Sequence, residues 1–169
     1  MSRTEPERLL IMDACVLIDY MNGEPELFKL ISSHIGTVFV ATPIIEEVDS
    51  INSLEELEEL GLIPLEPELD DVFLAGELDG KTSFQDNICY LTAKRQGLTC
   101  VTNDKNLRNR CAESEVPLIW GMELILKLVE AGGIVKEEAL IIAEEIHKTN
   151  PRHIGKKVLR SFRDKLTAL

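Results

Sequence analysis

The chain is poor in aromatic residues and lacks any long apolar run, and both absences restrict what it can be. Aromatic residues form only 5% of the 169 residues, so a core drawn from the 44% apolar content consists mainly of Leu, Ile and Val. A membrane helix needs about 18 apolar residues in a row, and the sequence contains no such run. The charged segment 2–8 is unlike a secretory signal. We therefore expect a cytoplasmic protein without a membrane span, with one core and room for an extension.

Cysteine and histidine also lack the spacings that bind metals. The cysteines are not paired as in zinc sites or disulfide frameworks, and they lie in core-like segments (Cys15, Cys89, Cys100 and Cys111). We expect free thiols with a packing role. The histidines share no ligand spacing and lie outside the acidic motifs described below (His34, His147 and His153).

Basic residues are missing from a long central stretch and concentrated at the C-terminus. Between Glu46 and Asp79 there are thirteen acids and neither Lys nor Arg. Residues 1–147 hold 29 acids against 11 Lys and Arg, whereas residues 148–169 hold Asp164 and seven bases (Lys148, Arg152, Lys156, Lys157, Arg160, Arg163 and Lys165). The acidic stretch is either a solvated face or the counter-charge of the basic tail, within one chain or across a dimer.

The order of apolar segments predicts an α/β fold. Five short runs have the apolar character of buried parallel strands, and helical segments lie between them (8–12, 37–41, 61–65, 99–102 and 117–120). This alternation predicts a three-layer α/β/α fold with a central parallel sheet of about five strands. We assign residues 1–131 to this domain.

Helix boundaries are marked by capping residues. Thr42 before Pro43 is typical of an N-cap followed by proline in the first turn. Ser53 with Glu56 predicts a capping box that opens a helix over 54–60. Ser83 opens a helix that runs to Gln96 and stops at Gly97, with one apolar face over Phe84, Ile88, Leu91 and the stem of Lys94.

Beyond Trp120 the sequence predicts only helices, over 121–130, 137–147 and 154–166. Residues 132–169 form a C-terminal helical extension. Its last helix carries apolar residues at a spacing of four and basic residues in the other directions (Lys156, Lys157, Arg160 and Arg163). This basic side is solvated, faces acidic residues or touches phosphate.

Four acids follow predicted strands or open predicted helices, where parallel sheets expose their strand ends (Asp13, Glu47, Asp86 and Asp104). Two carboxylates about 4 Å apart repel by about 4 kcal/mol at an effective dielectric of 20. Such a cluster favours a divalent cation, and oxygen ligands favour Mg²⁺ or Mn²⁺ over zinc. Asp13 and Asp86 are the expected metal ligands, Asp104 is the next ligand or a base that orients the water, and Glu47 is the most peripheral.

The residues around these acids leave alternatives open. Thr102 and Asn103 can hydrogen-bond a carboxylate or a phosphate beside the metal. Asp86 can serve only as the capping acid of Ser83, and Asp104 only as a turn residue. We expect Asp19 to cap a helix or to stay solvated.

Four motifs together resemble those of PIN-domain nucleases. They are Ile11-Met12-Asp13-Ala14-Cys15-Val16-Leu17-Ile18-Asp19, Pro43-x-x-x-Glu47-Val48, Ser83-x-x-Asp86 with Ala93-Lys94 and Gly97, and Val101-Thr102-Asn103-Asp104. The similarity covers residues 8–120 and keeps the order of the family. It departs from the family at Cys15, where the members that act as toxins more often carry Asn, Ser or Thr.

The resemblance implies metal-dependent cleavage of RNA at Asp13, Glu47, Asp86 and Asp104, with Mg²⁺ or Mn²⁺ as cofactor. The family includes VapC-like toxins of toxin-antitoxin pairs, so a homodimer and a protein antitoxin are implied partners. A net charge of -12 disfavours RNA, whose affinity comes largely from basic residues. The alternative is therefore a PIN-like module, weak or silent as an enzyme, that binds RNA or a protein.

Two other enzyme classes fit less well. A haloacid-dehalogenase phosphotransferase needs a second acid two residues after Asp13, where the chain has Cys15. A response-regulator receiver needs an aspartate after its third strand, where the run 62–65 leads to Glu66.

Overall fold

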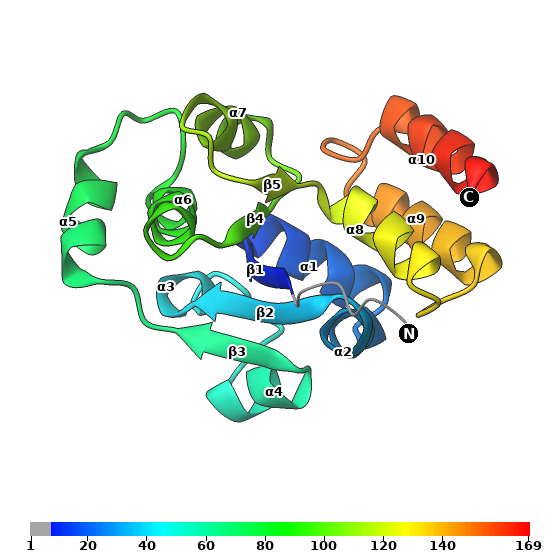
Figure 1. Cartoon of the computed structure of the whole chain (residues 1–169), viewed down its shortest axis with the longest axis horizontal. Coiled ribbons are helices and arrows are strands. Elements are labelled where there is room, and N and C mark those ends of the chain that lie inside the picture. The colour runs from blue at the N-terminus through cyan, green and yellow to red at the C-terminus, as the bar shows by residue number, and fades with distance from the viewer. Residues whose placement is uncertain (1–7) are drawn as a thin grey trace, which may run out of the picture.

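The computed structural model describes residues 8–169 and contains one sheet of five parallel strands (Figure 1). The order across the sheet is β3-β2-β1-β4-β5. The strands are β1 (Arg8–Met12), β2 (Gly36–Ala41), β3 (Leu62–Leu65), β4 (Thr99–Val101) and β5 (Leu118–Ile119). Each lies within about one residue of its predicted ends, which confirms the α/β class. The prediction that segment 2–8 is no secretory signal falls almost wholly outside the described residues.

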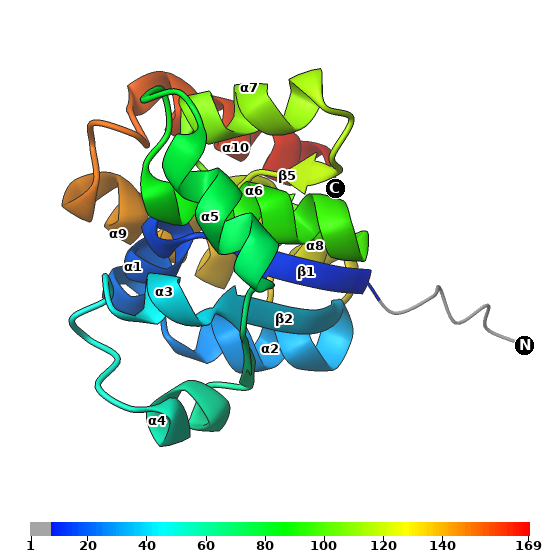
Figure 2. The same ribbon diagram turned by 90° about the vertical axis from the view of Figure 1, so that its left-hand side faces the viewer.

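Helices cover both faces of the sheet, as predicted for a three-layer fold. Ten helices are described: α1 (Ala14–Gly23), α2 (Glu26–His34), α3 (Thr42–Ile45), α4 (Leu54–Glu59), α5 (Leu69–Glu77), α6 (Phe84–Gln96), α7 (Lys105–Glu113), α8 (Gly121–Glu130), α9 (Lys136–Thr149) and α10 (Lys156–Ala168). Figure 2 shows α5 and α6 in front of β1 and β2, with α2 and α8 behind them.

The strand order creates one place where a crevice is expected. The chain moves outward from β1 through β2 to β3, and then returns to the other side of β1 with β4. The connections after β1 and β4 therefore leave the sheet in opposite directions. Doubly wound sheets bind their ligands at the carboxyl ends of such neighbouring strands. Asp13 directly follows β1, and Asp104 follows β4 by three residues.

Several predicted caps are confirmed and one is wrong. Ser53 accepts a hydrogen bond from the Glu56 amide at 3.1 Å, and Gly97 ends α6 with φ of 67°. Thr42 is the first residue of α3 rather than its cap, and its hydroxyl instead donates to Glu66 at 2.9 Å. A local cap signal was overridden here by a side-chain contact with the segment after β3.

The predicted single apolar face of α6 is only partly confirmed, because Ile88 and Leu91 are buried but the buried surface is wider than one face. Seven consecutive residues of this helix, 87–93, are buried, while Phe84 and Lys94 are exposed. The sheet lies on one side of α6, and α5 and α7 pack on others. A helix enclosed in this way has no solvent-facing stripe in its middle, so helical periodicity fails to predict its buried side.

The C-terminal helices pack on the body of the protein. α9 packs against α1 and α8, and α10 packs against α8 and α9. The predicted apolar stripe of the last helix is mostly confirmed, because Ile154, Phe162 and Leu166 are buried. Val158 is only half-buried, and Leu159 takes a buried place instead.

The described residues bear on two further expectations. The four cysteines are free thiols, as predicted, and three of them are buried. Among residues 8–169, no helix combines the length and apolar character that a membrane span requires.

Two glycines give a test of the β1–β2 pairing. A Cβ added at Gly36 would overlap the backbone of Arg8, whereas one added at Gly76 in α5 meets no described atom within 4 Å. Gly36→Ala should lower the free energy of unfolding by about 2–3 kcal/mol through overpacking. Gly76→Ala should raise it by about 0.5–1 kcal/mol, because alanine favours helix. Urea unfolding of both variants would show these opposite signs, and equal effects would contradict the register of β1 with β2.

Candidate acidic active site

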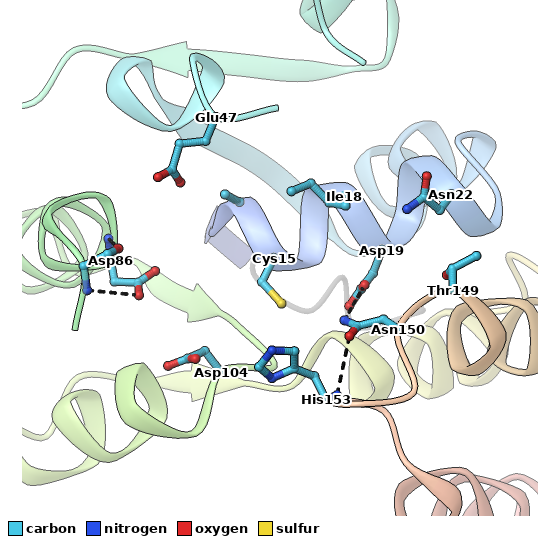
Figure 3. A pocket seen from close by; sticks show the side chains of 12 residues that line it. Cys15, Ile18, Asp19, Asn22, Glu47, Asp86, Asp104, Thr149, Asn150 and His153 are labelled. Atoms are coloured by element: carbon cyan, nitrogen blue, oxygen red, sulfur yellow. Dashed lines mark hydrogen bonds between the residues drawn. The ribbon is translucent and has the colours of Figure 1, made fainter. Parts of the chain in front are cut away.

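Three of the four predicted acids line one cavity of about 470 Å³. We call this cavity the acidic pocket. Its lining includes Glu47, Asp86, Asp104, Cys15 and His153. Figure 3 shows these side chains around a common space, although they come from segments far apart in the sequence. The structure thus brings together the acids that strand-end placement predicted.

Asp13 lies beneath the pocket rather than in its wall. It is 1% exposed and caps α1, with one carboxylate oxygen accepting from the Val16 amide at 2.9 Å. Burial is the main cause that raises the pKa of Asp13 to about 7, and the negative charges of Asp86 and Asp104 add a smaller part of this increase. Near neutral pH this carboxyl group therefore lies at the point of releasing its proton.

Thr102 connects Asp13 with Asp104. Its hydroxyl donates to the second carboxylate oxygen of Asp13 and accepts from the Asp104 amide at 3.0 Å. Asp104 in turn caps α7 by accepting from the Leu107 amide at 2.8 Å. A single buried hydroxyl therefore fixes the ends of β1 and β4 relative to each other. The hydrogen bond from Thr102 to Asp13 is the contact with a carboxylate that was predicted for Thr102.

Asp86 forms the capping box that its spacing from Ser83 predicts. The Ser83 hydroxyl accepts from the Asp86 amide at 3.0 Å, and one Asp86 oxygen accepts from the Ser83 amide at 3.4 Å. The same side chain lines the acidic pocket. Burial raises the pKa of Asp86, and so does the charge of Asp104. Capping and a place in the pocket therefore coexist in this residue.

Glu47 is the most exposed acid of the group, as its peripheral assignment predicted. It follows α3, and its carboxylate points toward the pocket (Figure 3). Partial burial raises the pKa of Glu47, and the charge of Asp86 adds to this effect. Its neighbour Glu46 is exposed and does not line the pocket. The choice of Glu47 over Glu46 thus agrees with their placement.

A second carboxylate beside the pocket was interpreted differently from the sequence. Asp19 was expected to cap a helix or to be solvated, but it is 1% exposed in the middle of α1. It accepts from the Asn103 amide group at 3.1 Å and from the Asn150 amide group at 2.8 Å. Asn103 also accepts from the Gly121 amide at 2.9 Å. Asn103 therefore joins a network that ties α1 to α8 and α9, and it hydrogen-bonds none of the four acids predicted for the site (Asp13, Glu47, Asp86 and Asp104).

His153 and Asn150 are pocket residues that sequence reasoning missed. Both come from the turn between α9 and α10, and both line the acidic pocket. Their only sequence signal is that they break the helical pattern of the extension. Burial raises the pKa of Asp19, whereas the hydrogen bonds from Asn150 and Asn103 and, to a smaller extent, the charge of His153 act to lower it. The C-terminal extension thus supplies part of the site wall.

The basic residues of the last helix do not reach the acidic stretch within the chain. Arg163 pairs with Glu144 of α9 at 2.8 Å, and Lys165 lies 3.9 Å from Glu123 of α8. The described ion pairs of the acidic stretch go elsewhere, Asp71 with Arg95 and Asp79 with Arg110. The expected meeting of acidic stretch and basic tail is therefore not found among the intrachain ion pairs of residues 8–169.

The donor chemistry of the pocket suits a hard divalent cation. Glu47, Asp86 and Asp104 offer carboxylate oxygens. Burial raises the pKa values of Glu47, Asp86 and Asp13, and the charges of neighbouring carboxylates raise them further from their ordinary values. Burial raises the pKa of the Cys15 thiol, as do the neighbouring carboxylates, so this residue is neutral in the metal-free protein. Among the described residues, however, no three His, Cys, Asp or Glu side chains already stand close enough to hold one ion. Binding would require the carboxylates to draw together.

Compared with known proteins, the chain matches no protein-family model, no curated protein and no solved structure. Its function therefore has to be inferred from its own sequence motifs and the geometry of the site.

The raised pKa of Asp13 predicts a pH-dependent stability in the metal-free protein. Between its ordinary value near 4 and the folded value of about 7, folded Asp13 holds a proton that the unfolded chain releases. Its contribution to stability is complete below pH 4 and is lost as pH rises to about 7, with a slope of up to about 1.4 kcal/mol per pH unit. Denaturant unfolding in EDTA should show this decline, and Asp13→Asn should flatten it.

Asp164→Asn, on the exposed surface of α10, is the control and should leave the decline unchanged. If Asp13→Asn keeps the full slope, another group causes the pH dependence and the buried proton of Asp13 is refuted.

Proposed function

We propose that the protein is a metal-dependent ribonuclease of the PIN-domain type, which cleaves RNA phosphodiester bonds at the acidic pocket. Asp13, Asp86 and Asp104 would hold Mg²⁺ or Mn²⁺, and Glu47 would complete the carboxylate set from the rim. The motifs that carry these residues resemble those of PIN-domain nucleases, and the resemblance supplies the choice of RNA as substrate.

One observation carries the proposal. Four carboxylates from four distant segments gather at the carboxyl edge of the sheet, beside the strand pair β1 and β4. Burial and mutual repulsion raise the pKa values of three of them. Helix capping explains three of these carboxylates separately, and it does not explain why Glu47, Asp86 and Asp104 line one pocket with Asp13 beneath it.

When bound, a divalent ion supplies an activated water and neutralises charge on the attacked phosphate. Neighbouring residues of the chain would fix the carboxylates in place around this ion. Thr102 holds Asp13 and the Asp104 amide, and Ser83 holds the backbone of Asp86. A carboxylate oxygen accepts at about two sites, so the hydrogen bonds of Asp13 leave each oxygen able to bind a cation.

A second candidate is a PIN-like module that binds RNA or a protein without turnover. It is favoured by the separation of the acids, since no three described His, Cys, Asp or Glu side chains form a ready group for one ion. The homodimer and the protein antitoxin implied by the resemblance belong to either candidate. Cleavage activity distinguishes the two.

The first test is cleavage of a mixed single-stranded RNA pool in Mn²⁺ and in EDTA. We expect cleavage only with Mn²⁺, and a loss of more than about 100-fold in Asp13→Asn, because removal of an outer partner alone typically costs 10- to 100-fold. Thr102→Val should fall within that smaller range. Glu46→Gln is the matched control for the acidic rim, and it should cleave as the parent does. Equal activity of the parent and Asp13→Asn would reject the ribonuclease proposal.

A second test separates metal binding from helix capping at Asp86. Saturating Mn²⁺, at about 100 times its Kd, should stabilise the parent by about 2.7 kcal/mol, a shift of roughly 5–10 °C in Tm for a chain of this size. Asp86→Asn keeps an oxygen for the cap and should lose most of this shift. Ser83→Ala should lose about 1 kcal/mol of cap energy and so have a lower Tm in EDTA. It should keep the increase in Tm that Mn²⁺ causes in the parent. The reverse pattern would leave Asp86 with capping as its only role.

A further inference from the structure

A second cavity, of about 490 Å³, lies between α9 and α10. We call it the basic groove. Four of its seven lining residues are Lys or Arg, and the others are a histidine, a leucine and one acid (Lys148, Lys156, Arg160, Arg163, His147, Leu159 and Glu144). In a chain of net charge -12, this concentration of positive charge in one groove is exceptional.

The positive charge of the groove is only partly neutralised. Lys148 pairs with Glu145 at 2.9 Å, and Arg163 pairs with Glu144 at 2.8 Å. Lys156 and Arg160 are exposed and take part in none of the ion pairs found within residues 8–169. They stand at positions i and i+4 of α10, where like charges destabilise a helix by about 0.2–0.5 kcal/mol. Neither side chain is therefore held by an ion pair with an acid among the described residues, although Glu144 lines the same groove.

The basic groove and the acidic pocket share one wall. His147 and Lys148 line the groove, and the next residues, Thr149 and Asn150, line the pocket. After the turn, His153 lines the pocket, and Lys156 lines the groove. The turn itself is fixed, since Asn150 donates to buried Asp19 and the His147 ring hydrogen-bonds the Ile154 carbonyl at 2.6 Å.

We propose that the basic groove binds the phosphate backbone of the RNA strand whose scissile bond lies in the acidic pocket. This inference rests on the proposed ribonuclease function and names where its substrate gains affinity. Lys156 and Arg160 contact phosphates directly, and the α9–α10 turn, with His153 on its pocket side, lies between the bound backbone and the carboxylates.

Electrostatics favours this division of the surface. An acidic pocket repels phosphate, so the affinity for RNA has to come from cations placed beside it. A phosphate backbone also has the repeated negative charge that a groove with several cations requires. A single acidic side chain of a protein partner would satisfy only one of these cations.

The test measures binding of a fluorescein-labelled polyuridylate strand to the full chain in EDTA, where cleavage is blocked. The affinity is followed from about 50 to 200 mM salt. Lys156→Ser combined with Arg160→Ser should flatten the slope of log affinity against log salt by roughly 1.4, at about 0.7 per lost phosphate contact. At 0.1 M salt this corresponds to binding about 25-fold weaker. The charge-preserving pair Lys156→Arg and Arg160→Lys should keep the parental slope.

Lys29→Ser combined with Lys136→Ser is the matched control, since it removes two exposed bases outside the groove. The groove variant is Lys156→Ser combined with Arg160→Ser. If its slope of log affinity against log salt equals that of the parent and its Mn²⁺-dependent cleavage is intact, the inference is overturned and the proposed function stands. A parent that neither binds nor cleaves the strand would overturn both. A change of oligomeric state in the groove variant, measured by light scattering with RNA affinity unchanged, would assign the groove to a protein contact instead.

Discussion

Three helices begin at or beside the acidic pocket, and a carboxylate of the site stands at the N-cap or in the first turn of each. Asp13 accepts from the first turn of α1, Asp104 from that of α7, and Asp86 completes the capping box of α6. A helix N-terminus carries roughly half a positive charge, so three ends offset about half of the charge of three carboxylates. This interaction allows an acid cluster to exist in a folded protein. It also leaves a remainder of negative charge, which contributes, after burial, to the raised pKa of Asp13.

The rigidity of the site follows from buried polar contacts that join distant segments. The Thr102 hydroxyl bridges Asp13 and the backbone of Asp104, and so connects the neighbouring strands β1 and β4. On the other side of α1, Asp19 holds Asn103 and Asn150 together. Buried polar groups are stable only when their partners are in place. Displacing either contact would therefore expose the strand ends on which the carboxylates depend.

The fold and the four acids were predictable because they depend on local signals. Apolar runs fixed the strands to within about one residue, and Asp13, Asp86 and Asp104 each occupy a place where a strand ends or a helix begins. The contribution of the C-terminal turn was not predictable. The Asn150 contact with Asp19 spans 131 residues of sequence, and His153 reaches the pocket only because α9 packs against α1. Such contacts arise from tertiary packing and leave no periodic trace in the sequence.

The separation of charge along the sequence becomes a close juxtaposition in space. The acidic body and the basic tail remain largely distinct surfaces, yet Asn150, through its bond to Asp19, fixes the turn that has carboxylates on one side and Lys156 on the other. Electrostatic attraction falls off within about 10 Å at 0.1 M salt. A polyanion approaching this protein therefore experiences the local sign of charge more than the net charge of -12. Overall acidity and affinity for a phosphate backbone are compatible as long as this turn keeps the two surfaces adjacent.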